Sequence, residues 1–259
     1  MVYELVLVYG IIAIFIGIGP IIGYSIWRFG YKKELWYSWL LGGLFWALAL
    51  ITSSIALMNL ISIFETAIYF IYIIIVISVV FETVFRILLF ILFTKFTADT
   101  SEKVLMAGFG WATFEAVFSY TIPFLLSIIF FRDNNFILQM DGIEFLLLFG
   151  GYKRFLTEVF QLVMIVMVFY GIKGYLKNDS EPIKENFFSR DPKPVWIWII
   201  IVAILQITYN FLFFAFLVYL GFYLAYLLIT IFIGVLVYYI VKRINIYPLF
   251  TLKSVDFTD

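Results

Sequence analysis

The sequence contains no cysteine and no histidine among its 259 residues. The absence of Cys excludes disulfide bonds, thiolate metal sites and cysteine nucleophiles. The absence of His removes the commonest zinc ligand and the commonest general acid or base near neutral pH. Any catalysis by this chain would therefore depend on carboxylates, hydroxyls, Lys, Arg or Tyr.

Charged residues are also scarce, at 13% of the chain, and the formal net charge at pH 7 is zero. Soluble domains contain about 25% charged and about 50% apolar residues, whereas 65% of this chain is hydrophobic and 22% aromatic. One soluble core cannot bury so much apolar surface, but lipid accepts it, and aromatic side chains suit the two membrane interfaces. The zero net charge provides no global basic field that would attract nucleic acid or anionic lipid.

Long apolar segments divide the whole sequence. A helix needs about 20 residues to cross the roughly 30 Å of hydrocarbon in a bilayer. The sequence therefore predicts an all-α protein, a single integral membrane domain with a bundle of seven spanning helices. These helices are expected near residues 4–28, 35–62, 67–95, 103–131, 145–174, 194–218 and 221–241.

Interruptions are predicted in three of these segments. Pro20 lies inside the first segment and predicts a bend there, since proline removes a backbone hydrogen bond. The third and fifth segments are longer than a span requires, so each is expected to be tilted or broken. If the fifth is broken, the Gly150-Gly151 pair is one place where the break is expected.

Basic residues favour one orientation in the cell membrane. Lys and Arg gather after the first, third and fifth segments and in the C-terminal tail, and such loops usually face the cytoplasm. We therefore expect a multi-pass protein with its N-terminus outside and its C-terminus in the cytoplasm. Residues 175–193 would then form a cytoplasmic loop and residues 242–259 a cytoplasmic tail.

A few polar and charged residues lie well inside the apolar segments, where a charge costs about 2.5–3.5 kcal/mol on insertion scales and needs a partner. Glu82 and Arg86 stand four residues apart on one helical face and can pair with each other. In the fourth segment Trp111 and Glu115 share a face, with Tyr120 beyond them. Glycines in the same segment permit close helix approach.

The fifth and sixth segments add further polar side chains. Spacings of three and four residues place several of them on one face of the fifth segment; these are Arg154, Thr157, Glu158 and Gln161. The sixth segment offers hydrogen-bonding groups to the same interior, namely Gln206, Tyr209 and Asn210. This cluster is interpreted either as an ion-pair network that fixes helix packing or as a site that binds or transforms a ligand.

Three segments also follow, in order, the motifs of a known family. Phe81, Glu82 and Arg86 stand at the positions of a Glu-Glu-x-x-x-Arg motif. A Gly-x-Gly-His-Gly-x-x-Glu motif is matched in position by Gly108, Gly110, Trp111, Ala112 and Glu115. A Glu-Arg pair with a His seven residues after the Arg is matched in position by Lys153, Arg154 and Gln161. Over residues 1–175 the chain thus resembles the YhfC-type intramembrane metalloprotease family, related to PrsW and the CAAX-processing proteases.

The resemblance implies a bundle of about seven helices in which these motifs would form a metal site. Phe81, Trp111 and Gln161, however, stand where the family has a Glu and two His residues. Zinc hydrolysis needs such ligands, an open coordination position and a carboxylate that accepts a proton. The resemblance therefore implies a relative with degenerate ligand positions, and we expect no metal and no other cofactor.

The favoured function is a non-catalytic binding or scaffold protein whose partners are membrane lipid and another membrane protein or transmembrane segment. One alternative is a channel or transport component, such as the polytopic part of a DNA or macromolecule translocation machine; nucleic acid would be a partner only in that case. A second alternative is a carboxylate-based membrane hydrolase, because neighbouring buried glutamates can supply an acid and a base. Its candidate catalytic residues are Glu82, Glu115 and Glu158.

Overall fold

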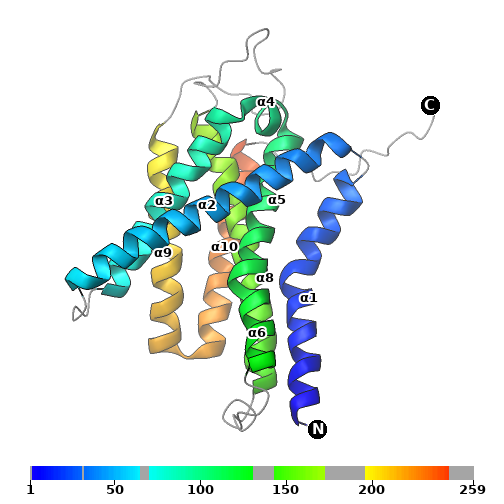
Figure 1. Cartoon of the computed structure of the whole chain (residues 1–259), viewed down its shortest axis with the longest axis vertical. Coiled ribbons are helices and arrows are strands. Elements are labelled where there is room, and N and C mark those ends of the chain that lie inside the picture. Colours follow the sequence, from blue (N-terminus) through cyan, green and yellow to red (C-terminus); the bar gives the residue numbers. More distant parts are fainter. Residues whose placement is uncertain (1, 31, 65–69, 131–142, 173–195, 245–259) are drawn as a thin grey trace.

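The computed structural model describes residues 2–30, 32–64, 70–130, 143–172 and 196–244, and the regular elements in these ranges are all helices. Figure 1 shows their arrangement. The elements are α1 (Val2–Phe29), α2 (Lys33–Phe64), α3 (Phe70–Leu92), α4 (Thr94–Thr97), α5 (Ser101–Ala116), the π-helical turn η1 (Val117–Thr121), α6 (Ile122–Phe130), α8 (Ile143–Ile172), α9 (Trp196–Leu220) and α10 (Phe222–Ile244). The predicted all-α fold is confirmed for this part of the chain.

Each of the seven predicted segments coincides with one helix or a run of helices. Within the described ranges, α1, α2, α3, α8 and α10 are long and apolar enough to cross a membrane, and α9 contains a shorter apolar helix over Ile197–Phe213. Such helices are characteristic of a membrane protein. The predicted loop at 175–193 and residues 245–259 of the predicted tail lie outside the described residues.

The structure corrects one predicted break and locates two others. α8 is continuous from Ile143 to Ile172, so the break predicted at Gly150-Gly151 was wrong. The third segment, in contrast, ends as a long helix at Leu92, and the short α4 follows it. α1 remains helical through Pro20 but changes direction along its length, as Figure 1 shows.

The fourth predicted segment is helical from Ser101 to Phe130 but contains one π-helical turn, η1. Pro123 lies just beyond that turn; its missing N–H and its ring prevent a regular α-helical bond to the preceding turn. A π-helical turn contains one residue more than an α-helical turn, and such turns are frequent at functional sites. Tyr120 lies on this widened turn.

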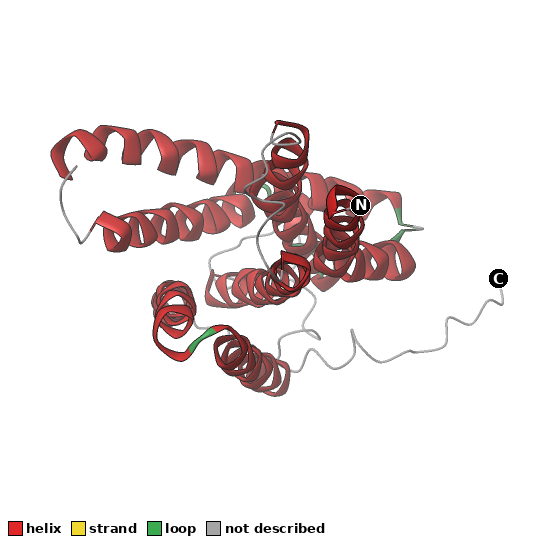
Figure 2. Cartoon of the chain, turned by 90° about the horizontal axis from the view of Figure 1, so that it is seen from below, coloured by secondary structure: helices red, strands yellow, loops and turns green. Residues whose placement is uncertain are grey.

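α8 is the central helix of the bundle. In the apolar stretch of α8, 72% of the residues are buried inside the bundle, whereas 28–33% are buried in the corresponding stretches of the other four candidate spans. α1, α3, α5, α9 and α10 all pack against it. Figure 2 shows α2 and α3 extending together away from the other helices, so that much of their surface is left for lipid.

The closest helix contact joins α2 and α5 through two glycines. A Cβ atom built on Gly42 would lie 1.9 Å from the carbonyl oxygen of Ala107, and one on Gly110 would lie 1.7 Å from that of Trp39. Backbones can approach this closely only where side chains are missing, as is common between membrane helices. Gly151 has the same role between α8 and α1, where a Cβ would lie 2.3 Å from the carbonyl oxygen of Ala13.

We expect Gly42→Ala and Gly110→Ala to destabilise the bundle, because each added methyl group must displace the facing backbone. Overpacking costs about 1–3 kcal/mol. Gly234→Ala in α10 is the matched control, since a Cβ there meets nothing within 4 Å. Thermal unfolding of the purified proteins in detergent measures the difference; equal stability of the Gly110 and Gly234 variants would contradict the close α2–α5 contact.

Candidate functional site

Arg86 of α3 is the centre of a polar cluster inside the bundle, and its side chain is 0% exposed. One terminal nitrogen donates to Glu82 Oε2 at 2.8 Å and to Gln161 Oε1 of α8, and the other donates to Gln206 Oε1 of α9 at 2.6 Å. Gln206 also donates to Glu82 Oε2 at 2.5 Å. The predicted Glu82–Arg86 pair is thus confirmed, and two glutamines from other helices complete it.

Trp111 of α5 covers the same guanidinium group. The Arg86 Cζ atom lies 4.7 Å from the centroid of the indole ring, and the Trp111 side chain is fully buried. Such a cation–π contact is worth up to about 2 kcal/mol when it is removed from water. Arg86 therefore joins the third, fourth and fifth predicted segments, which carry the three motifs, at one point.

A second group of charges surrounds Arg154 of α8. Its Nη2 atom lies 3.2 Å from Glu115 Oε1 of α5, and its Nε atom lies 3.7 Å from Glu158 Oε1 one turn along α8. Thr157 hydrogen-bonds the Tyr209 hydroxyl at 2.8 Å beside this group. The predicted face of α8 is therefore polar from Arg154 to Gln161, with Gln161 facing Arg86 and Arg154 facing Glu115.

The two groups differ in how well their polar atoms are paired. Around Arg86, both terminal nitrogens of the guanidinium group make short hydrogen bonds to side-chain oxygens. Nε of Arg86 and the indole nitrogen of Trp111 are buried without a hydrogen-bond partner among the described residues. Around Arg154, its Nε and Nη2, the second oxygen of Glu115 and both oxygens of Glu158 are buried without a hydrogen-bond partner among the described residues. Buried polar atoms are normally hydrogen-bonded. The group around Arg154 is therefore the one whose donors and acceptors could still form hydrogen bonds.

Two predicted site residues do not join these groups. The Tyr120 hydroxyl on η1 is buried without a hydrogen-bond partner among the described residues, and it lies near Gly150 of α8. Among the residues that the structure describes, Asn210 of α9 makes no hydrogen bond to the cluster. The neighbouring Tyr209 packs against α8, where its ring stacks on Phe160 with centroids 4.4 Å apart.

The cluster holds three carboxylates and two guanidinium groups, and each carboxylate pairs with an Arg. Lys153 does not add a fourth pair; its ammonium lies over the Phe213 ring, 3.9 Å from the centroid. Among the described residues, no three His, Cys, Asp or Glu side chains are grouped as metal ligands. The geometry can hold four helices together and offer donors and acceptors; it presents no carboxylate free of an ion pair.

No family model matches the chain, and no curated protein matches it. The resemblance to intramembrane metalloproteases therefore stays a prediction that depends on the three motifs. What the structure adds is that residues of all three motifs contact one another around Arg86.

We expect Arg86→Met to destabilise the protein by about 3–5 kcal/mol, because it leaves Glu82 without its ion pair inside the bundle. Adding Glu82→Gln should restore part of this loss, since the neutral amide needs no counter-charge and still faces Gln206. Chemical unfolding in detergent of the two single variants and the double variant measures the coupling. A double variant less stable than Arg86→Met alone would contradict the pairing.

Proposed function

We propose that this chain is a multi-pass protein of the cell membrane that crosses it seven times, with its N-terminus outside and its C-terminus in the cytoplasm. Its function is to bind a partner inside the membrane without catalysis. The seven helical segments and the basic residues at the ends of α1 and α10, Arg28 and Lys242, support this orientation.

One observation carries the absence of catalysis, namely that Trp111 and Gln161, at the positions of the two motif His residues, contact Arg86. In the resembled family, the positions of Trp111 and Gln161 would hold metal ligands; here the indole ring and the amide oxygen both contact the Arg86 guanidinium. Neither side chain supplies the imidazole that a zinc site needs, and the Glu82 carboxylate is paired with Arg86. We infer a family relative that kept the bundle and the motif arginine but lost the side chains that would hold a metal, at Phe81, Trp111 and Gln161.

The binding function is supported by the charges around Arg154. Both oxygens of Glu158 and two nitrogens of Arg154 are buried without a hydrogen-bond partner among the described residues, which suits a partner with both donors and acceptors. The cluster reaches the surface through Glu82 and Glu115, whose side chains are 21% and 14% exposed. We infer that the partner is a transmembrane segment of another membrane protein with a polar side chain at this depth, because an unpaired polar group in hydrocarbon is costly.

The two alternative functions have less support. A carboxylate-based hydrolase needs an acid and a base, whereas Glu82, Glu115 and Glu158 are each paired with an arginine. A nucleic-acid channel needs basic residues along its lining, whereas Arg86 and Arg154 are neutralised by those glutamates.

We expect the protein purified in detergent, after expression with trace metals, to contain no zinc or other transition metal above the level of a buffer blank. The reason is that Phe81, Trp111 and Gln161 supply neither the carboxylate nor the imidazoles of the three motifs. Elemental mass spectrometry measures the metal content. A stoichiometric metal that is lost in Glu115→Gln would contradict the proposal and restore a hydrolase.

Glu158→Gln separates binding from packing. We expect the isolated variant to keep its stability within about 1 kcal/mol, because the amide has the same shape and removes a carboxylate that lacks hydrogen bonds. We also expect it to lose its partner, so that less of the protein migrates as a complex in native gels of mildly solubilised membranes.

Glu144→Gln in the first turn of α8 is the matched control for this experiment. It removes the same charge from the same helix, away from the cluster, and should leave both stability and the complex unchanged. A loss of several kcal/mol in Glu158→Gln, or a complex that persists in it, would mean that the Arg154 group serves helix packing alone.

A further inference from the structure

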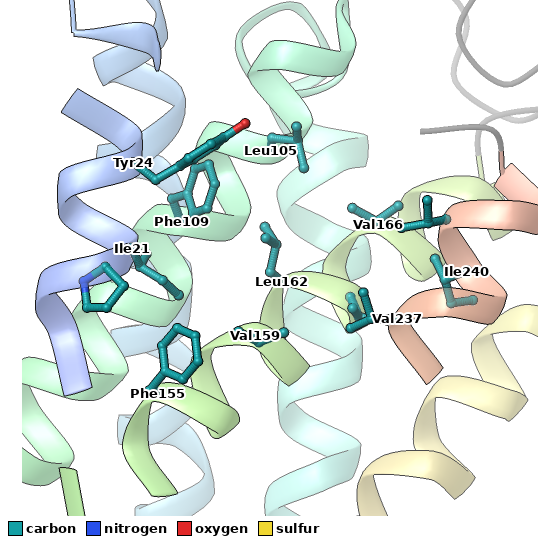
Figure 3. A pocket seen from close by; sticks show the side chains of 13 residues that line it. Ile21, Tyr24, Leu105, Phe109, Phe155, Val159, Leu162, Val166, Val237 and Ile240 are labelled. Carbon is teal, nitrogen blue, oxygen red and sulfur yellow. The ribbon is translucent and has the colours of Figure 1, made fainter. Parts of the chain in front are cut away.

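A second feature of the bundle is an apolar cavity of about 370 Å³ between α1, α5, α8 and α10. Figure 3 shows it from close by. Its walls include Pro20, Ile21, Phe109, Val163, Val237 and Ile240. It is separate from the polar cluster, since α8 borders it with Phe155, Val159 and Leu162, each one position along from Arg154, Glu158 and Gln161 respectively.

The cavity occupies the half of the bundle that lies near one set of helix ends. Leu105, in its wall, is four residues from the start of α5, and Val241 is three residues from the end of α10. Along α8 it extends from Phe155 to Val166, about 16 Å at 1.5 Å per residue. Since the hydrocarbon of a bilayer is about 30 Å thick, this length corresponds to one leaflet.

Basic residues lie where the cavity meets this end of the bundle. Arg28 is in the last turn of α1, one turn beyond the wall residue Tyr24, and Lys242 directly follows the wall residue Val241 on α10. Tyr24 is the polar residue of the wall, and Figure 3 shows its hydroxyl at the upper end of the cavity. The long axis of the cavity is therefore apolar, with cationic groups at one end.

The acidic residues near the start of α5 do not cancel these two charges, because they are paired with other lysines. Glu102 forms an ion pair with Lys32 at 2.6 Å, and Asp99 forms one with Lys103 at 2.9 Å. Among the described residues, no ion pair neutralises Arg28 or Lys242, and the Lys242 ammonium lies 5.8 Å from the centroid of the Tyr238 ring.

We propose that the cavity binds one acyl chain of an anionic phospholipid, with its phosphate beside Arg28 and Lys242. The cavity volume of about 370 Å³ lies in the range of about 300–1,000 Å³ for small-molecule sites. The apolar wall suits an acyl chain, and the basic end selects a negative headgroup. This inference does not depend on the partner proposed for the polar cluster.

The test uses the full-length protein in bilayer nanodiscs with phosphatidylglycerol that carries a photoreactive diazirine in its acyl chain. We expect mass spectrometry to map the adducts to cavity residues of α1, α8 or α10. We also expect excess unlabelled phosphatidylglycerol, but not phosphatidylcholine with the same acyl chains, to compete. Equal competition by both lipids, or adducts spread evenly over the lipid-facing surface, would overturn the proposal.

Two pairs of variants make the test specific. Val237→Trp fills the cavity and should abolish the cavity adducts, whereas Val235→Trp, at a side chain 62% exposed on the same helix, should not. Arg28→Gln with Lys242→Gln should lower the preference for phosphatidylglycerol about fivefold for each charge, as expected for a basic residue at an anionic surface. Lys33→Gln, at the exposed start of α2, is its control.

Each outcome of these variants bears on the proposal. Unchanged labelling in Val237→Trp overturns the cavity as the site, and unchanged preference in the double charge variant overturns the headgroup assignment. If Val237→Trp instead releases a membrane protein from native membranes while lipid labelling persists, the occupant is a polypeptide and the proposal is wrong.

Discussion

The burial of the Arg86 guanidinium among apolar helices is the constraint on which the rest of this structure depends. A charged group at membrane depth needs hydrogen-bonding partners from its surroundings, and α3 itself supplies only Glu82. The remaining partners come from α8 and α9, and the ring of Trp111 comes from α5. Since apolar side chains gain little by leaving lipid for each other, these polar contacts determine which faces of the four helices meet.

The network can form only because the helix backbones approach closely. Gly110 lets α5 contact α2 on the side away from α8. Gly108 lies on the same helix but faces α8, where a Cβ would be 2.6 Å from Leu162. α5 is thus held between two neighbours at short distance, and its two polar contacts, through Trp111 and Glu115, reach the arginines of α3 and α8.

α8 combines two chemically different surfaces. One carries Arg154, Glu158 and Gln161 and contacts α3, α5 and α9; the adjacent one is apolar and, with Val163 and Val166, forms a wall of the cavity beside α1 and α10. A partner inside the membrane and a bound lipid could therefore act on the same central helix without sharing a site. Because α8 is the most buried of the candidate spans, a shift of α8 caused at either surface would alter its packing against all the neighbouring helices.

The sequence by itself determined the helices and their polar faces, because both depend on local properties: the length of apolar segments and the 3.6-residue period that places Glu82 beside Arg86. Hydropathy could not show that Gly151 serves close contact with α1 and that the Gly150-Gly151 pair makes no break, or that Gln206 and not Asn210 joins the cluster. Nor could it show that Trp111 covers Arg86 while Glu115 pairs with Arg154, or that an apolar cavity lies beside α8. These features were decided by the tertiary structure alone, because spacing fixes the faces of a helix, whereas rotation, tilt and close packing decide which faces meet.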